Sequence, residues 1–391
     1  MTVDSAPRRY PFEPFTGDLP DELLEMIVSN PVSRVLLPDD REAWLVLGYQ
    51  DCCTVLADPR FSRLARGNEA EATDDDDTRG LNRNGPSHTS LRRVATRALT
   101  ARRTEAFRPR VQQRVDELID AMIAGPRPAD LVSGLVAALP LLVVCDVLGI
   151  PDSDRKRFYR WLQDINAITG YGSADAAEAL GEMRVYLAEQ AEAKRASPAD
   201  DLLSAWVSAV DSDEVTSAEV VSLAEGVLIG AIEINTTTAG IRALFQYPEQ
   251  LRKLLDAPEK VSSATDEMLR YTAVSSMFRV QVVTEELELS GVAMRAGDLV
   301  MAIPWVGNRD PRFFPEPNVF DIDRRPAVPH LTFGYGPHFC AGALLGKMEV
   351  ELSVGTLLRR LPGLAPAVPL DELPWRHHRV NCGIASFPVV W

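Results

Sequence analysis

One of the five cysteines stands in a setting that suits a metal ligand. Cys340 lies near the end of the run from Phe333 to Gly342, Phe-Gly-Tyr-Gly-Pro-His-Phe-Cys-Ala-Gly, and precedes an apolar stretch that predicts a helix. The glycines let backbone N–H groups turn toward the sulfur, and the N-terminus of the helix adds positive potential that favours a thiolate. Such a thiolate can ligate heme iron. The other cysteines are interpreted as small buried apolar residues: Cys52, Cys53, Cys145 and Cys382.

A glycine-rich loop before a helix can also bind phosphate, but this one lacks the Gly-Lys-Ser/Thr ending that a phosphate loop needs. The run instead fits Phe-Gly-x-Gly-x-His-x-Cys-x-Gly and resembles the signature of the cytochrome P450 heme-thiolate monooxygenases. Further landmarks of that family follow in order from about Pro11 to Pro388. The resemblance implies a mainly α fold, a helix-rich prism with small β-sheets and heme b between distal and proximal helices. It makes Cys340 the iron ligand and places three loop residues at the cofactor: Phe333, Gly334 and Gly342.

A second group of residues could hold the cofactor's propionates. His88 and Arg92 are four residues apart, so on a helix they share a face. Taken alone, the pair is typical of an ordinary helix surface. The resemblance implies that both bind heme propionates, together with Arg279 and His338, through charge-assisted contacts of about 1.5–3 kcal/mol each.

A third constellation indicates a structural role. Glu267 and Arg270 lie three apart, which on an exposed helix contributes only about 0.2–0.5 kcal/mol. With Arg324 downstream, they are similar to the family's Glu-Arg-Arg cluster, which braces the proximal side. Nearby basic residues could form a dock for a ferredoxin or a plain charged surface, and both interpretations stay open: Arg93, Arg97, Arg102, Arg103 and Lys347.

The predicted distal helix departs from the family's Ala-Gly-x-Asp/Glu-Thr pattern, in which an acid and an alcohol deliver protons during oxygen activation. When the family pattern is aligned by counting back from Tyr247, Ala231 falls at the acid position and Ile232 at the alcohol position. When the acid position is instead assigned to Glu233, Ile234 falls at the alcohol position. In either register isoleucine replaces the alcohol. Hydroxylation or epoxidation with a proton relay through substrate or water is one outcome. Radical coupling of aromatic rings without oxygen insertion, for example in cyclodipeptides, and a catalytically silent heme-binding partner are the alternatives.

The resemblance also places a substrate pocket above the heme. It implies a bulky, ring-bearing natural product as substrate, and a ferredoxin with its reductase as electron source. Phe387, in the turn of a C-terminal hairpin, could stack on an aromatic ligand or could serve only ordinary hairpin packing. The complete set of predicted pocket residues is Ala65, Pro86, Gly230, Val274, Met277 and Phe387.

Length and composition agree with a single domain over residues 1–391. Hydrophobic residues make up 46% of the chain, and its net charge of −15 argues against binding to nucleic acid or to an anionic membrane. Unpatterned cysteines indicate a reducing compartment, so we expect a cytoplasmic protein, and a monomer is compatible with the sequence. The first twenty residues predict no signal peptide. The apolar stretch Leu131–Ile150 contains Pro140 and Asp146, which favours a buried helix pair over a membrane span.

Hydrophobic periodicity makes helix the dominant class. A short strand is predicted over Trp44–Tyr49, and alternating strands with two glycine turns are predicted over Val280–Ile303. The predicted helices span 50–58, 87–99, 108–124, 131–148, 152–168, 174–196, 217–245 and 248–255.

Overall fold

The computed structural model describes residues 7–12, 18–63, 77–166, 174–230, 235–272, 279–376 and 383–391. Its first helices are α1 (Asp21–Ser29), α2 (Tyr49–Ala57), α3 (Gly85–Ala98), α4 (Ala101–Ala106), α5 (Arg108–Ala124), α6 (Leu139–Leu148), α7 (Arg155–Asn166) and α8 (Ala174–Ala196). Those that follow are α9 (Leu202–Val210), α10 (Ser217–Gly230), α11 (Asn235–Gln246), α12 (Pro248–Asp256), α13 (Val261–Tyr271), α14 (Pro304–Gly307) and α15 (Ala343–Arg360).

The strands are short and gather into three sheets. The largest has the order β1-β2-β3-β9-β6-β4, built from Arg8–Arg9, Val32–Leu36, Glu42–Val46, Leu299–Ala302, Gln281–Val283 and Phe61–Arg63. The second has the order β10-β11-β5 (Ala365–Pro366, Pro388–Val390 and Ala129–Asp130), and the third pairs β7 (Leu287–Leu289) with β8 (Val292–Met294). Strand β4 lies at one edge of the largest sheet.

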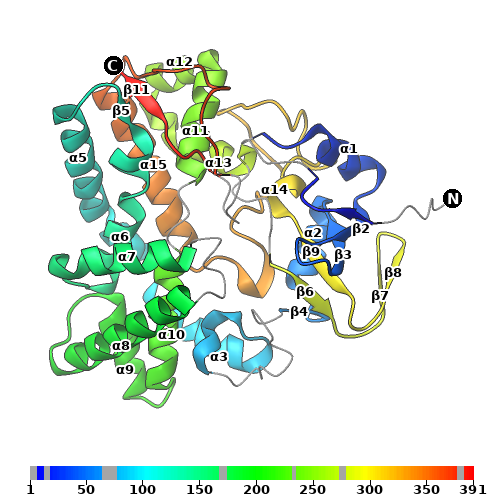
Figure 1. Cartoon of the computed structure of the whole chain (residues 1–391), viewed down its shortest axis with the longest axis horizontal. Helices are drawn as coiled ribbons and strands as arrows, with labels where there is room; N and C mark the ends of the chain where they lie inside the picture. The colour runs from blue at the N-terminus through cyan, green and yellow to red at the C-terminus, as the bar shows by residue number, and fades with distance from the viewer. Residues whose placement is uncertain are drawn as a thin grey trace.

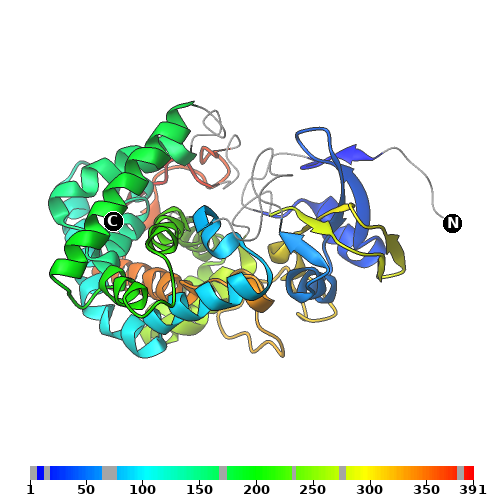
Figure 2. The same ribbon diagram turned by 90° about the horizontal axis from the view of Figure 1, so that it is seen from below.

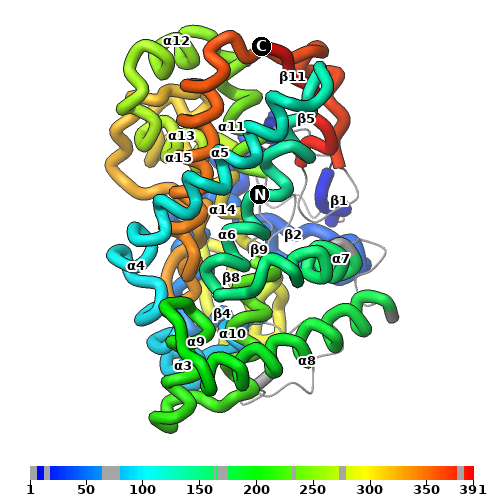
Figure 3. Tube along the Cα trace, turned by 90° about the vertical axis from the view of Figure 1, so that its left-hand side faces the viewer, coloured from blue at the N-terminus to red at the C-terminus, as the bar shows by residue number. Residues whose placement is uncertain are grey.

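Helices and the large sheet occupy different sides of the molecule. Figure 1 shows α3 and α5 to α10 on one side and the β1–β4 and β6–β9 strands with α1 and α2 on the other. Figure 2 shows the same separation from below. In Figure 3 the tubes of α5 and α15 run together, and these two helices pack against each other. Helix α15 thereby connects the Cys340 loop to the helical core.

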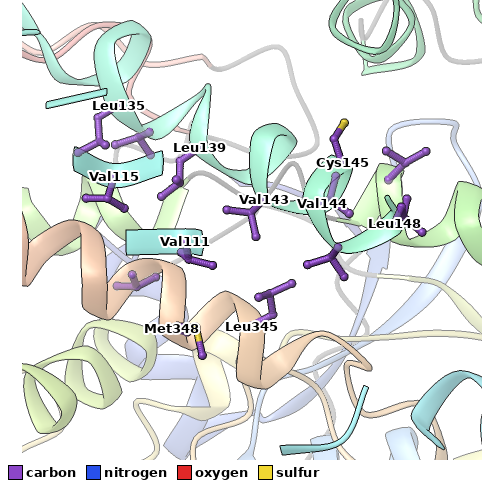
Figure 4. Packing of buried hydrophobic residues seen from close by; sticks show 14 of the residues in the cluster. Val111, Val115, Leu135, Leu139, Val143, Val144, Cys145, Leu148, Leu345 and Met348 are labelled. Atoms are coloured by element: carbon purple, nitrogen blue, oxygen red, sulfur yellow. The ribbon is translucent and has the colours of Figure 1, made fainter. Parts of the chain in front are cut away.

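The main core lies among α5, α6 and α15. Figure 4 shows Val111 of α5 between Val143 of α6 and Leu345 of α15, and Val115 of α5 beside Leu139 of α6. Trp206 of α9 is also completely buried in this cluster. Burial of aliphatic side chains is the dominant contribution to the stability of the fold, and it contributes about 25 cal/mol per Å² of apolar surface removed from water. The helix that follows Cys340 is therefore fixed along its length.

Several predicted helices are confirmed, two of them at both ends: α5 spans 108–124 and α8 spans 174–196, as predicted. The predicted helix pair in 131–150 is confirmed as a π-helical turn at Val132–Val136 followed by α6, which has Pro140 in its first turn and ends at Gly149 in the left-handed region, φ 74°. Residues 217–245 form α10 and α11, with 231–234 outside the described residues.

The predicted strand Trp44–Tyr49 is wrong at its end. Strand β3 stops at Val46 and α2 begins at Tyr49, because the N–H of Tyr49 donates to the buried carboxylate of Asp310, far along the chain. The strands predicted in 280–303 are confirmed, and the turn between β7 and β8 uses positive φ at Ser290 and Gly291. Within the described residues, we find no helix long and apolar enough to cross a bilayer.

Candidate heme-thiolate site

The Cys340 loop is held by backbone contacts. The N–H of Cys340 donates to the carbonyl of Phe333 at 2.8 Å, and Gly334 and Gly336 adopt φ values of 77° and 71° that glycine alone tolerates well. A Cβ atom on Gly336 would run into Ala57, at the end of α2. Helix α15 begins just after the cysteine, with Gly342 as its N-cap. Together these contacts fix the position of the sulfur.

Cys340 differs from the other described cysteines in its exposure. Cys52, Cys53 and Cys145 are buried, whereas Cys340 is exposed. Burial around the loop nevertheless raises the pKa of the Cys340 thiol, while the N–H of Gly342 and the guanidinium of Arg92 act in the opposite direction. The predicted contribution of local positive potential is present, but in the chain alone the lost hydration outweighs it, and the net shift of the Cys340 pKa is upward. The side chain of Cys340 is thus accessible to a bound group, while the surrounding loop reduces its hydration. Such a position suits a sulfur that coordinates a metal.

Four of the predicted cofactor-binding residues come together from distant parts of the chain. His88 and Arg92 lie on α3, and the rings of His88 and His338 are 4.1 Å apart between centroids. Burial lowers the pKa of His88 to about 4 and that of His338 to about 3, and nearby guanidinium groups, including Arg279 for His338, add to the effect. The structure thus places four donors around one desolvated space.

A fifth cationic residue, which the sequence analysis missed, joins this group. Burial, together with the charges of Arg279 and Arg92, lowers the pKa of Arg63 to about 9. Arg63 ends β4, more than twenty residues before His88 and more than two hundred before Arg279. No short spacing or motif in the sequence relates Arg63 to His88 or Arg279. A strand prediction over Phe61–Arg63, paired with the strand that follows Arg279, could have found it.

These residues fit a dianionic group. Neither Arg63 nor Arg92 forms an ion pair with a carboxylate of the described residues, and Nε2 of the buried His88 has no hydrogen-bond partner there. Leaving such groups unsatisfied is costly, since a buried unpartnered donor loses about 1–3 kcal/mol. Two carboxylates opposite these donors would satisfy them. Heme supplies two propionates and an iron for the open sulfur of Cys340, so the residues present fit this cofactor.

The Glu267 cluster forms a buried network. Both carboxylate oxygens of Glu267 accept hydrogen bonds of 2.7 Å from Arg270, and Nε of Arg324 donates to the same carboxylate at 3.1 Å. The side chains of Glu267 and Arg270 are each 2% exposed. The remaining guanidinium N–H groups donate to carbonyls, including those of Asn308 and Val319. The network thus connects α13 to the segment that precedes the Cys340 loop.

Much of the predicted distal pocket lies outside the described residues: Ala65, Ala231, Ile232, Glu233, Ile234, Val274 and Met277. Gly230, the last residue of α10, is exposed, and no atom lies within 4 Å of where its Cβ would be. Pro86 is exposed in the first turn of α3. Phe387 is completely buried, packs edge-on against Phe245 and donates its N–H to Asp130. This position favours hairpin packing over stacking on a ligand.

The polar residues after the predicted relay serve contacts within the fold. The hydroxyl of Thr238 donates to the carbonyl of Asn235, and the side-chain oxygen of Asn235 accepts from Arg376 at 3.4 Å.

The fold and the site together fit a class of protein, the helical oxidoreductases that bind a heme through a cysteine, since an open cysteine and a group of cations lie on one helical fold. The family model described as Cytochrome P450 matches residues 260–365, the part that contains Glu267, Arg324 and Cys340. The chain is 37% identical to mycinamicin IV hydroxylase/epoxidase of Micromonospora griseorubida, over all of both chains. It is also 37% identical to the P450 monooxygenase PikC of Streptomyces venezuelae, over 96% of this chain and 92% of PikC.

Solved structures agree. The LnmA cytochrome P450 hydroxylase from the leinamycin pathway of Streptomyces atroolivaceus superposes with a TM-score of 0.90 at 36% identity, over 98% of this chain and all of that one. The mixed-function P450 MycG gives a TM-score of 0.89 at 36% identity, over 99% and 100%. This chain therefore belongs to the cytochrome P450 family and is an oxidoreductase of the monooxygenase type. The predicted mainly α P450 fold is confirmed.

Proposed function

We propose that this protein hydroxylates or epoxidises a bulky natural product, with dioxygen and electrons from a ferredoxin and its reductase. Two observations in one structure carry this proposal. Cys340 is exposed, and His88, Arg92 and Arg63 lack carboxylate partners among the described residues. The names of the relatives support the substrate class, since mycinamicin IV and the leinamycin pathway belong to natural-product biosynthesis.

In this proposal heme b, when bound, supplies the oxygen-activating iron. Cys340 would supply its sulfur to the iron, and the backbone contact of Cys340 with Phe333 would hold the loop that carries this sulfur. His88, Arg92, Arg279 and His338 bind the propionates and so orient the group. Gly334 and Gly342 shape the loop, and Glu267 with Arg270 and Arg324 keeps the preceding segment in place.

The predicted ferredoxin dock carries less free charge than its sequence indicates. Arg97 pairs with Glu214 at 2.8 Å, and Arg103 pairs with Asp200 at 2.9 Å. Lys347 likewise pairs with Asp266 at 2.6 Å. Arg93 and Arg102 are exposed. If an acidic ferredoxin docks at these basic residues in the cytoplasm, its carboxylates compete with Glu214, Asp200 and Asp266 for them. Added salt should then lower the rate of electron transfer.

The test begins with the spectrum of the reduced carbon monoxide complex. Wild-type protein should show the thiolate-type band, and Cys340→Ser should lose it, whereas Cys145→Ala should keep it because that sulfur lies in the helical core. An unchanged spectrum in Cys340→Ser would contradict the ligand assignment. Turnover with a ferredoxin, its reductase and NADPH under labelled dioxygen then examines the reaction. Label in the product supports insertion, and a product without label indicates radical coupling.

A further inference from the structure

Arg83 lies in the short stretch of chain just before α3 and reaches a second helix. Its side chain is buried, with 3% exposed, and forms an ion pair with Glu219, in the first turn of α10. Helix α10 is the first part of the predicted distal helix. The next residue, Asn84, is the N-cap residue of α3, the helix that carries His88 and Arg92. Arg83 therefore links the helix of two predicted propionate ligands directly to the distal helix.

The carboxylate of Glu219 is fixed by a capping box at the start of α10. One of its oxygens accepts a hydrogen bond from the N–H of Thr216 at 2.7 Å, and the hydroxyl oxygen of Thr216 accepts from the N–H of Glu219 at 3.1 Å. The other carboxylate oxygen accepts from Nη1 of Arg83. Because this carboxylate is held by the backbone of the helix terminus, it gives the guanidinium of Arg83 a defined position relative to α10.

The residues just before Arg83 contact the same helix and also the cysteine loop. A Cβ atom on Gly80, whose φ is 51°, would run into the hydroxyl of Ser222 on α10. The backbone of Leu81 is hydrogen-bonded to the imidazole of His338, in the cysteine loop. The stretch from Gly80 to Arg83 thus contacts both α10 and a third predicted propionate ligand.

We infer that Arg83 is a positioning residue: by pairing with Glu219 it sets how close the heme lies to the distal helix. The inference rests on the proposed function, because it takes the groups on α3 and His338 to bind the propionates. Those groups would fix one edge of the heme, and the contact between Arg83 and Glu219 holds their segment against α10. The resulting spacing limits the size of a group that can bind at the iron on the distal side.

The test measures how the site discriminates between two iron ligands of different size, imidazole and 4-phenylimidazole. Both coordinate heme iron, but the phenyl ring needs more room beside the distal helix. Glu219→Gln keeps the capping box and removes the charge that pairs with Arg83. Dissociation constants come from titrating the Soret band of the heme-loaded protein. Their ratio should change by about tenfold in favour of the larger ligand, which corresponds to the loss of one charge-assisted contact.

Glu214→Gln is the matched control. Glu214 lies five residues before Glu219 and pairs with Arg97, also on α3, but these side chains are 28% and 56% exposed. The control should keep the ratio within about twofold of the wild-type value, because exposed ion pairs contribute little. Arg83→Met should reproduce the effect of Glu219→Gln, and the double variant should show no further change, since both substitutions break the same contact.

Three outcomes would overturn the inference while the proposed function stands. These are equal ratios in Glu219→Gln and Glu214→Gln, effects of Arg83→Met and Glu219→Gln that add in the double variant, and an Arg83→Met variant with a lower thermal midpoint but the wild-type ratio. The last outcome would make the role of Arg83 purely structural. Should Arg83→Met fail to take up heme, the comparison of Glu219→Gln with Glu214→Gln decides alone. Absence of the thiolate-type carbon monoxide band in wild-type protein would instead contradict the proposed function itself.

Discussion

The side-chain oxygen of Asn235, in the first turn of α11, occupies the space beside Gly383 that a Cβ atom would need. The same oxygen accepts a hydrogen bond from Arg376, whose backbone N–H donates to the carbonyl of Gly383 at 2.8 Å. This close approach joins the distal helix to the C-terminal hairpin.

Gly383→Ala should therefore destabilise the fold. The added methyl group overlaps Asn235, and overpacking of this kind costs about 1–3 kcal/mol. Thermal unfolding should show a lower midpoint than for the wild-type protein. Gly363→Ala serves as the control, because no atom lies within 4 Å of where its Cβ would be. Equal midpoints for the two variants would show that the hairpin can move away from the helix without cost.

Glu267→Ala should lose about 3–5 kcal/mol of unfolding free energy, because it leaves the buried guanidinium of Arg270 without its carboxylate. Heme content should fall with it, since Glu267 also holds Arg324 and the N–H of Asp321 in the segment leading to Cys340. Denaturant titration and the heme-to-protein absorbance ratio measure both effects. Glu259→Ala changes an exposed carboxylate of the preceding turn and should alter neither quantity. A Glu267→Ala protein as stable as this control would remove the structural assignment.

Acid should weaken the heme-free protein through His88. Its pKa is about 4 in the folded chain against an ordinary value of 6.5, so the unfolded chain binds the proton more readily. This contribution to stability is complete above pH 6.5 and is lost as the pH falls from there toward about 4. His88→Asn should lose less unfolding free energy over that interval than the wild type does. Identical pH profiles from calorimetry of the two heme-free proteins would contradict the prediction.

The predicted distal relay, which lies outside the described residues, can be tested by restoring its alcohol. Ile232→Thr corresponds to the register counted from Tyr247, and Ile234→Thr to the register set by Glu233. The variant in the correct register should raise the fraction of product that retains labelled oxygen, because the hydroxyl improves proton delivery. The other variant is its matched control. If neither changes the product ratio, the relay argument is wrong in both registers.

The sequence by itself predicted the loop and helix around Cys340 and its proposed role as iron ligand. The glycines, the histidine and the apolar run around it are local, and local spacing suffices to predict a loop that leads into a helix. The same reasoning predicted both ends of α5 and α8.

The tertiary structure decided which side chains share a space and which charges are already paired. It brought Arg63 to Arg279 through the pairing of β4 with β6, buried Phe387 against Phe245, and gave Arg97 an acidic partner more than a hundred residues away. Burial around Cys340 likewise reversed the direction expected for its pKa. Hydration and ion pairing depend on segments far apart in the chain, and their proximity is fixed only when strands pair and helices pack.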